Sequence, residues 1–436
     1  MHADQSQRAA RLEVGFFHDP ALSRHPPKNA SSRESFQVDN LSGLNPACPM
    51  NQKPFPGSGI SAMILAAAIS SPALSEQVRV EKTPNGGIQP QAVMDSNGRL
   101  HLIYFNGDPM RGDIYYVTRE EGSPYSRPIR VNSQARSAIA TGSVRGAHLA
   151  VDGDGRPHVA WMGSDEAQPR PRIGAPMLYT RLDDARSAFE AQRNLVTWAT
   201  GLDGGGSVAA DNQGNVFVVW HAGPDGHDAG EEARGVFVAR SANKGRNFTK
   251  ETRADKEAGG ACGCCGMRAF SDGPGKLNLL YRSASNSNRD MKLLMSNDSG
   301  ATFETSTLNH WRVAKCPMST SGMSKSPDLL LLASEIGGGI QLRGVSRSRS
   351  KDLPQSPVHT VRGRNGKHPV VARNQRGETL LAWIEGSGWN RGGALAWTLL
   401  DKDWHASPSQ TIENSVPVWS LLSAVSLPDG AFILFH

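Results

Sequence analysis

The sequence predicts an all-β fold, a β-propeller of four-stranded blades. Two observations carry this prediction: a hairpin pattern that recurs about every 60 residues, and the lack of helical periodicity between its copies. Glycine also accounts for 46 of the 436 residues, which exceeds the roughly 7% typical of proteins and indicates many tight turns. The net charge of +6 is spread along the chain, which argues against a nucleic-acid-binding surface.

The first 75 residues are not expected to belong to the propeller. Residues 1–49 show neither helical nor strand periodicity, and we interpret them as a disordered extension or an over-extended start. Residues 50–75 have the pattern of a signal peptide: a basic start, an apolar run over residues 60–69, and small residues before an expected cleavage after Ser75. A displaced buried helix is the alternative.

The apolar run over residues 60–69 is too short for an ordinary transmembrane helix. We therefore expect a mature protein without a stable membrane span. Its predicted location is the periplasm or the extracellular space.

Residues 76–436 are expected to form one domain of repeated hairpins. Each copy has an apolar strand, an Asp or Asn with Gly three residues on, and a second apolar strand that ends in an aromatic residue. Asn, Asp and Gly tolerate the left-handed conformations of tight hairpins. The copies begin at Asp95, Asp152, Asp211, Asp272 and Asn374, with a shortened copy at Asp429 and a degenerate one within residues 328–343.

These copies amount to seven inner hairpins, or to a six-bladed ring if the degenerate copy is not a hairpin. The second strands, such as Val216–Trp220, are almost continuously apolar, which indicates strands covered on both faces. The chain ends directly after the seventh hairpin, so the last blade lacks outer strands. The segment Gln77–Glu81 could supply one of them and close the ring.

Two turns between the hairpins share a second motif, Ser-x-Asp-x-Gly-x-x-aromatic. Its hydroxyl and carboxylate can accept hydrogen bonds from turn amides, and its aromatic residue can pack between strands. The matching residues are Ser296, Asp298, Gly300 and Phe303 in one copy, and Ser241, Asn243, Gly245 and Phe248 in the other. Both copies are in phase with the longer repeat.

On these motifs the chain resembles the sialidase-like, Asp-box (BNR) propeller superfamily. It is most similar to exported bacterial members that combine a Cys-x-Cys-Cys segment, here residues 262–265, with a downstream Cys-Pro-Met, here residues 316–318. The resemblance implies a glycan-binding protein, with glycoside hydrolase activity of the exo-sialidase type as one possibility. The family's aromatic-Arg-Ile-Pro signature is absent near the first blade, so enzymatic activity stays open.

Blade topology predicts which face carries function. Turns between strands 1 and 2 and strands 3 and 4 lie on one face, whereas 2–3 turns and interblade connections lie on the other, here called the upper face. The unusual polar residues fall in the second set, and their convergence around the axis makes the upper face the predicted ligand site.

The candidate catalytic residues on the upper face are Glu385, Arg282, Arg289 and Arg391. Further ligand-face candidates are Arg145, His148, His221, Arg268, Asp290, His368 and Trp389. Glu385 follows a buried strand, where a raised pKa would suit an acid or base, although it could equally cap the loop. The predicted ligand is a glycan or another anionic small molecule, with a protein-interaction scaffold as an alternative and no nucleic acid.

The cysteines allow two interpretations. Cleavage after Ser75 would leave Cys262, Cys264, Cys265 and Cys316. Structural disulfides are the first interpretation, because an exported protein meets an oxidising compartment. The alternative is a soft-metal or redox site for copper or zinc, since thiolates are the ligands such ions prefer. No other cofactor is predicted.

Overall fold

The computed structural model describes residues 77–436 except 224–229, 257–258, 348–356 and 364. The chain divides into two units, residues 1–68 and residues 69–436, and the first unit lies outside the described residues. The predicted N-terminal extension (1–49) and signal peptide (50–75) also lie outside them. Within the described ranges, no helix combines the length and apolar character needed to cross a membrane.

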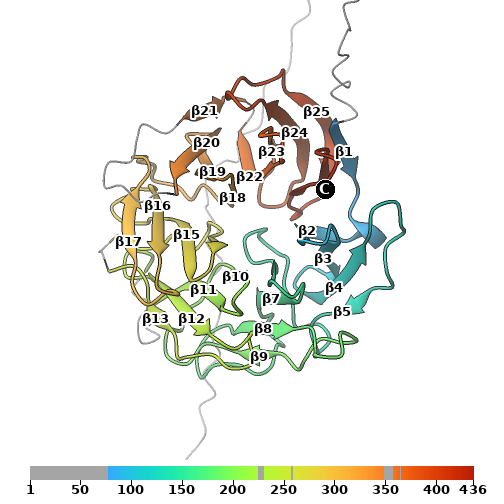
Figure 1. Cartoon of the computed structure of the whole chain (residues 1–436). Helices are drawn as coiled ribbons and strands as arrows, with labels where there is room; N and C mark the ends of the chain where they lie inside the picture. The colour runs from blue at the N-terminus through green and yellow to red at the C-terminus, as the bar shows by residue number, and fades with distance from the viewer. Residues whose placement is uncertain (1–76, 224–229, 257–258, 348–356, 364) are drawn as a thin grey trace, which may run out of the picture. The chain divides into compact units, whose positions relative to one another are not determined.

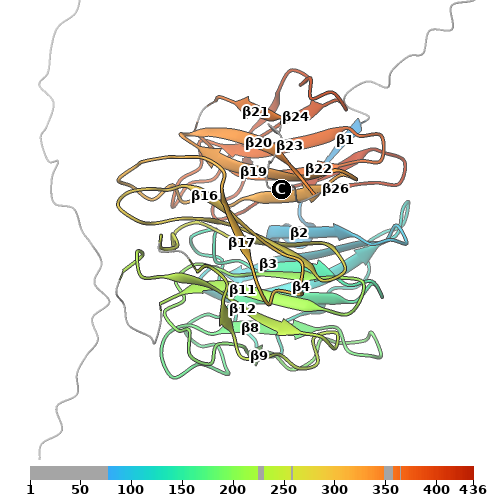
Figure 2. The same ribbon diagram turned by 60° about the vertical axis from the view of Figure 1, so that its left-hand side comes forward.

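The described residues form a β-propeller of seven blades, six with four strands and one with three (Figures 1 and 2). The innermost strands of neighbouring blades contact one another in a complete circuit, β2 to β6, β10, β14, β18, β22, β26 and back to β2. The predicted fold class is confirmed. The seven-hairpin interpretation is correct and the six-bladed alternative is wrong.

The strand bounds follow the repeat. Blade 1 contains β2 (Ile88–Met94), β3 (Leu100–Asp108), β4 (Arg111–Arg119) and β5 (Ile129–Arg130). Blade 2 contains β6 (His148–Val151), β7 (Pro157–Met162), β8 (Met177–Arg181) and β9 (Arg193–Asn194). Blade 3 contains β10 (Ser207–Ala210), β11 (Val216–Ala222), β12 (Gly235–Ser241) and β13 (Thr252–Arg253). Blade 4 contains β14 (Arg268–Gly273), β15 (Lys276–Arg282), β16 (Met291–Ser296) and β17 (Glu304–Thr307).

Blade 5 contains β18 (Gly322–Lys325), β19 (Leu329–Ile336), β20 (Gly339–Ser346) and β21 (Val358–Val361). The degenerate copy, residues 328–343, covers its second strand β19 and most of its third strand β20. Blade 6 contains β22 (Gly366–Arg373), β23 (Thr379–Glu385), β24 (Gly393–Leu400) and β25 (Gln410–Val416). Blade 7 contains β26 (Ser423–Ser426) and β27 (Phe432–Phe435), with β1 (Val78–Glu81) as its third strand. The short 3-10 turn η1 (Pro84–Gly86) follows β1.

The ring is closed by the start of the propeller chain, as the sequence predicted. Strand β1 pairs in parallel with β27, from Val78 opposite Phe432 to Glu81 opposite Phe435. The backbone N–H of Thr83 and its hydroxyl both donate to the carbonyl of His436, each at 2.9 Å. The two ends of the described chain therefore complete one sheet.

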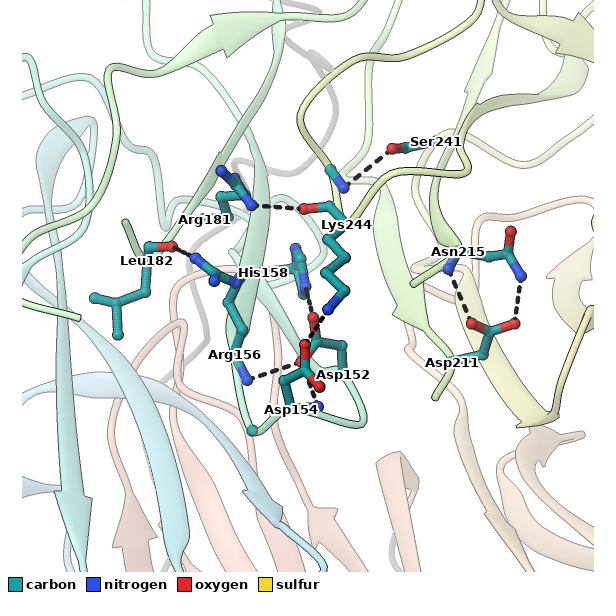
Figure 3. A network of polar contacts seen from close by, with 12 residues as sticks. Asp152, Asp154, Arg156, His158, Arg181, Leu182, Asp211, Asn215, Ser241 and Lys244 are labelled. Atoms are coloured by element: carbon teal, nitrogen blue, oxygen red, sulfur yellow. Dashed lines mark hydrogen bonds and ion pairs between the residues drawn. The ribbon is translucent and has the colours of Figure 1, made fainter. Parts of the chain in front are cut away.

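The inner hairpin turns share one hydrogen-bonding scheme, which Figure 3 shows for blades 2 and 3. In blade 2 the Asp152 carboxylate accepts from the backbone N–H groups of Asp154 and Arg156 at 3.0 and 2.9 Å. Its other oxygen lies 3.2 Å from Nε2 of buried His158, whose Nδ1 lies 2.7 Å from the Tyr179 hydroxyl. The repeated Asp thus caps a tight turn and orients a buried imidazole.

The same side chain caps the corresponding turns of the neighbouring blades. In blade 1, Asp95 accepts from two turn amides and lies 3.3 Å from His101. In blade 3, Asp211 accepts from the N–H groups of Gln213 and Asn215, each at 2.9 Å. The sequence repeat therefore corresponds to the same hydrogen bonds, from turn N–H groups to an Asp carboxylate, in each of these blades.

The two Ser-x-Asp/Asn motifs join the third and fourth strands of blades 4 and 3. The hydroxyl of Ser296 donates to Asp298 at 2.7 Å and accepts from the N–H of Gly300 at 2.8 Å. In the other copy, Ser241 does the same with Asn243 and Gly245 at 2.9 and 3.0 Å. Both glycines have positive φ, near 75°, which explains why the motif requires glycine there.

The aromatic residues of the two motifs pack against the blades. Phe248 contacts the Tyr179 ring edge-on, with the ring centroids 4.7 Å apart. Phe303 packs against the apolar core between blades 3 and 4. Each motif thus fixes a turn and joins two blades.

Ring closure can be tested at Val78, which is buried against the core of blades 6 and 7. We expect Val78→Ala to lower the free energy of unfolding by about 2 kcal/mol, because it removes buried methyl groups from the closing strand. Arg79→Ala is the matched control on the same strand, since Arg79 pairs with Asp429 only at the exposed surface. Urea unfolding curves that shift equally for both variants would contradict this prediction.

Candidate functional site

A channel of about 400 Å³ lies between the inner strands around the propeller axis. Three cationic side chains line it, from Arg268, Lys325 and Arg373. Within the described part of the chain, no Asp or Glu belongs to the lining. The channel therefore presents unbalanced positive charge to whatever enters it.

The Arg268 side chain crosses the channel at its upper end. Arg268 opens β14, directly after an interblade connection, and its guanidinium donates to Gln91 Oε1 of β2 at 2.8 Å and to His148 Nδ1 of β6 at 3.2 Å. Arg268, Gln91 and His148 occupy equivalent positions in their blades. Their partners on the second strands are Leu280, Ile103 and Ala160, and each partner directly precedes the aromatic residue of its strand. Blades 4, 1 and 2 thus meet at one level of the channel.

The hydrogen bonds around His148 define its protonation. An arginine can only donate, so Nδ1 of His148 accepts and the proton of the neutral ring sits on Nε2. The hydroxyl of Ser207, 2.9 Å from the same Nδ1, itself accepts from the backbone N–H of Ala269 at 3.0 Å. Burial and the charge of Arg268 lower the pKa of His148 to about 3.

The Arg268 guanidinium carries a charge that the surrounding protein leaves unpaired. Burial lowers its pKa to about 10, so it remains protonated at neutral pH. Among the described residues its guanidinium hydrogen-bonds to the neutral side chains of Gln91 and His148, and its Nε has no hydrogen-bond partner. The side chain keeps some accessible surface because it faces the channel, although protein surrounds it on all sides.

The four predicted cysteines converge on the upper face. Cys262 Sγ lies 3.5 Å from Cys265 Sγ and 3.7 Å from Cys316 Sγ. Glu231 Oε1 lies 4.0 Å from Cys264 Sγ and 3.8 Å from Cys316 Sγ. Cys262 and Cys265 are buried, whereas Cys264 and Cys316 are half-buried. The sequence was right to treat the four residues as one group.

All four cysteines are free thiols, so the disulfides predicted first are not formed. A disulfide needs its two sulfur atoms about 2.05 Å apart, whereas Cys262 Sγ lies 3.5 Å from Cys265 Sγ and 3.7 Å from Cys316 Sγ. The Cys262 thiol thus shares its contacts between two other thiols and is not bonded to either.

Positive side chains surround this thiol group. Arg289 lies 3.0 Å from Glu231 Oε2, and Arg234 lies 3.8 Å from Glu231 Oε1. The hydrogen bonds from Cys262 and Cys316, followed by the charges of Arg234 and Arg145, lower the pKa of Cys264 to about 3 against the effect of burial. Hydrogen bonding to the other thiols raises the pKa of Cys262 instead. Of the two half-buried cysteines, Cys264 thus favours the thiolate, whereas the pKa of Cys316 is raised.

The candidate catalytic residues lie in two separate blades. In blade 4, Arg282 donates to the backbone carbonyls of Arg289 and Glu335 at 3.0 and 2.7 Å, and its guanidinium stacks 5.0 Å from the Trp311 ring. In blade 6, Glu385 ends β23 and accepts from the Trp383 indole at 3.1 Å, while Arg391 lies exposed in the following loop. Blade 5 separates the two pairs.

The remaining ligand-face candidates occupy three places. Arg145 pairs with Asp203 at 3.1 Å, and His221 accepts from the N–H of Gly204 at 3.1 Å, both near the cysteines. The carboxylate of Asp290 accepts from the N–H of Trp311 at 2.8 Å. His368 and Trp389 line a small hollow with Met318, Lys367 and Ser143.

Sequence reasoning missed several residues of the channel and of the cysteine group. Gln91 shares Arg268 across the channel, and Glu231 completes the cysteine group. Glu335 is a buried carboxyl whose pKa is raised by burial despite the nearby charge of Arg282. Gln91 and Glu335 lie inside apolar-looking strands, and Glu231 lies in a charged loop, so no local pattern distinguishes them.

No family model and no curated protein matches this chain. Among solved structures, the Hadza microbial sialidase Hz136 is 13% identical with a TM-score of 0.43, over 76% of this chain and 66% of that one. The intramolecular trans-sialidase from Ruminococcus gnavus is 10% identical with a TM-score of 0.46, over 73% and 95% of the two chains. The α-L-arabinanase of Penicillium chrysogenum is 11% identical with a TM-score of 0.45, over 74% and 95%. At these values the likeness says nothing about activity.

Three buried histidines predict an acid-sensitive fold. Burial, with a nearby cation in each case, lowers the pKa of His148 and His368 to about 3 and that of His221 to about 4. An unfolded chain, with histidine pKa values near 6.5, therefore binds more protons as the pH falls from about 6.5 to 4. Stability should fall in that window, by roughly 2 kcal/mol per histidine at pH 5.

Urea unfolding between pH 7.5 and 5 measures this loss. We expect His368→Gln to flatten the pH dependence, because one buried imidazole no longer has to be kept neutral. His405→Gln is the control, since the side chain of His405 is 80% exposed. A pH dependence that His368→Gln leaves unchanged would refute the assignment.

Proposed function

We propose that this chain is an exported, ligand-binding propeller that holds the anionic group of a glycan at the upper end of its central channel. The observation that carries the proposal is the Arg268 guanidinium, which crosses the channel without a carboxylate partner among the described residues. A channel whose charged lining residues are all cations is electrostatically complementary to an anion.

The energetics favour an anionic occupant. A buried charge without a counter-ion costs several kcal/mol, and proteins usually pair or neutralise such groups. Gln91 and His148 share the guanidinium protons but supply no negative charge. A carboxylate, sulfate or phosphate at Arg268 would supply it through charge-assisted hydrogen bonds.

Two further features suit a sugar-borne anion. The channel lining includes the hydroxyl side chains of Thr320, Ser321 and Ser324, which can hydrogen-bond to sugar hydroxyls. Outside the channel lining, Trp389 of the small hollow beside His368 is 47% exposed and offers an apolar ring surface for stacking. The resemblance of the Ser-x-Asp/Asn turns to the Asp-box superfamily points to the same ligand class.

We propose binding and not glycosidic cleavage as the function of the channel. Glycoside hydrolysis uses a pair of carboxyl groups, or a tyrosine assisted by one, at the scissile bond. The described lining of the channel contains neither a carboxylate nor a tyrosine. Glu385 and Arg391 lie in blade 6 outside that lining, so their predicted catalytic role remains a prediction.

Arg268→Gln tests the proposal because the amide keeps part of the hydrogen bonding but loses the charge. We expect N-acetylneuraminate, which carries a carboxylate, to bind the wild-type protein and to bind Arg268→Gln at least about 10-fold more weakly, since a charged hydrogen bond contributes about 1.5–3 kcal/mol. Isothermal titration calorimetry provides the affinities, and added salt should weaken binding.

Arg246→Gln is the matched control, as an exposed arginine in the turn between β12 and β13. A neutral sugar, N-acetylmannosamine, serves as the uncharged ligand. The anion site would be rejected if the neutral sugar bound as tightly as N-acetylneuraminate. It would also be rejected if Arg268→Gln bound N-acetylneuraminate with wild-type affinity. Export is tested separately by the N-terminal sequence of the secreted protein, which should begin at Glu76.

A further inference from the structure

We infer that the thiol group formed by Cys262, Cys264, Cys265 and Cys316, together with Glu231, is a binding site for a thiophilic d¹⁰ cation, Zn²⁺ or Cu⁺. This site is distinct from the channel and does not depend on the proposed glycan ligand. Among the described residues, Glu231, Cys264 and Cys316 form the one group of three such ligand atoms lying within 4.8 Å of one another.

The distances between sulfur atoms fit metal coordination. With Zn–S bonds of about 2.3 Å, the sulfur atoms of a tetrahedral site lie about 3.8 Å apart. The two measured separations from Cys262 Sγ are 3.5 and 3.7 Å, to Cys265 and Cys316. These sulfur atoms are thus too far apart for disulfides and close to the spacing that one shared cation imposes.

The ligands come from three segments whose backbones are tied together. Cys262, Cys264 and Cys265 lie in the connection between blades 3 and 4, Cys316 lies in the connection between blades 4 and 5, and Glu231 lies in the loop between β11 and β12. The N–H groups of Ala261 and Gly263 donate to the Glu231 carbonyl and Oε1 at 3.1 and 3.2 Å. The Cys262 N–H donates to the Arg282 carbonyl at 2.9 Å.

The charges around the group fit a metal thiolate. Four thiolates with one Zn²⁺, or three with one Cu⁺, leave a net charge of about −2. Arg289 and Arg234 lie within 4.0 Å of Glu231, and Arg145 reaches the same region through Asp203, which also pairs with Arg234 at 3.4 Å. Guanidinium groups would repel a bare cation, but they stabilise an anionic complex.

Binding is a ligand exchange that needs no oxidant or reductant. Each coordinating S–H gives its proton to the buffer as the sulfur electron pair forms the bond to the metal, so binding releases protons. Cys316 belongs to both sets of close ligand atoms, because it lies 3.7 Å from Cys262 Sγ and within 4.8 Å of the Glu231 and Cys264 ligand atoms. The fourth position falls to Cys265 or Glu231, and thiolate-only coordination suits Cu⁺ better than a carboxylate does.

The experiment uses the full chain, reduced under anaerobic conditions and titrated with Zn²⁺ or Cu⁺ against a competing chelator. We expect one equivalent to bind, with proton release and a higher thermal unfolding midpoint, because the assembled site binds the metal more tightly than the unfolded chain does. Cobalt(II) should give the intense visible bands of tetrahedral thiolate coordination. Comparing the Zn²⁺ and Cu⁺ arms identifies the preferred cation, and stoichiometric binding of either supports the site.

The variants distinguish residues that bind the metal from residues that only lie near it. Cys262→Ser should weaken binding at least about 100-fold, since even outer partners of metal ligands contribute 10–100-fold. Glu231→Gln should weaken zinc binding about 10-fold, whereas Glu232→Gln should not, because the adjacent Glu232 is exposed and accepts from the N–H of Asn286. Cys316→Ser provides a second thiol variant if Cys262→Ser does not fold.

Two results would overturn the site. One is a reduced wild-type protein that binds neither cation stoichiometrically. The other is a folded Cys262→Ser or Cys316→Ser variant that binds as tightly as wild type. Neither result would affect the channel proposal, whose readout is anion binding at Arg268.

Discussion

The parallel pairing of β1 with β27 is the constraint on which the rest of the structure depends. Without it the first and last blades would be joined only through their inner strands β2 and β26, by contacts such as the hydrogen bond from the Ala92 N–H to the Ser423 hydroxyl at 2.8 Å. The channel exists only because the circuit of inner strands is closed. Arg268 of blade 4 can reach Gln91 of blade 1 only when the ring has a fixed size.

The fold could be predicted because the residues that determine each turn are close together in the sequence. Five of the seven inner turns place an Asp or Asn and a Gly three residues apart. The structure shows the reason: in blades 1–3 the carboxylate accepts from turn amides. The degenerate copy within residues 328–343 lacks that Asp–Gly spacing. It could still be assigned because the apolar strand β19 occupies the expected place in the repeat.

The sites were less predictable because they arise between blades. Topology predicted that Arg268, His148 and the cysteines share the upper face, but their partners are distant in sequence. Gln91 and Arg268 are separated by 177 positions, and Glu231 and Cys316 by 85. Which residues face one another depends on seven blades and not six, and the sequence left that choice open. Cysteine spacing alone likewise could not separate disulfides from free thiols.

The two proposed sites are connected through one short segment. Only Gly266 and Met267 separate Cys265 from Arg268, and the Gly266 N–H donates to the Ser319 carbonyl at 3.0 Å. Ser319 lies just after Cys316, so both connections that carry the thiols also meet beside the start of β14. A cation that fixes Cys265 and Cys316 would therefore restrict the backbone from which Arg268 extends. Because an arginine side chain loses rotamer freedom when it binds an anion, a more rigid start of β14 would lower the entropic cost of ligand binding in the channel.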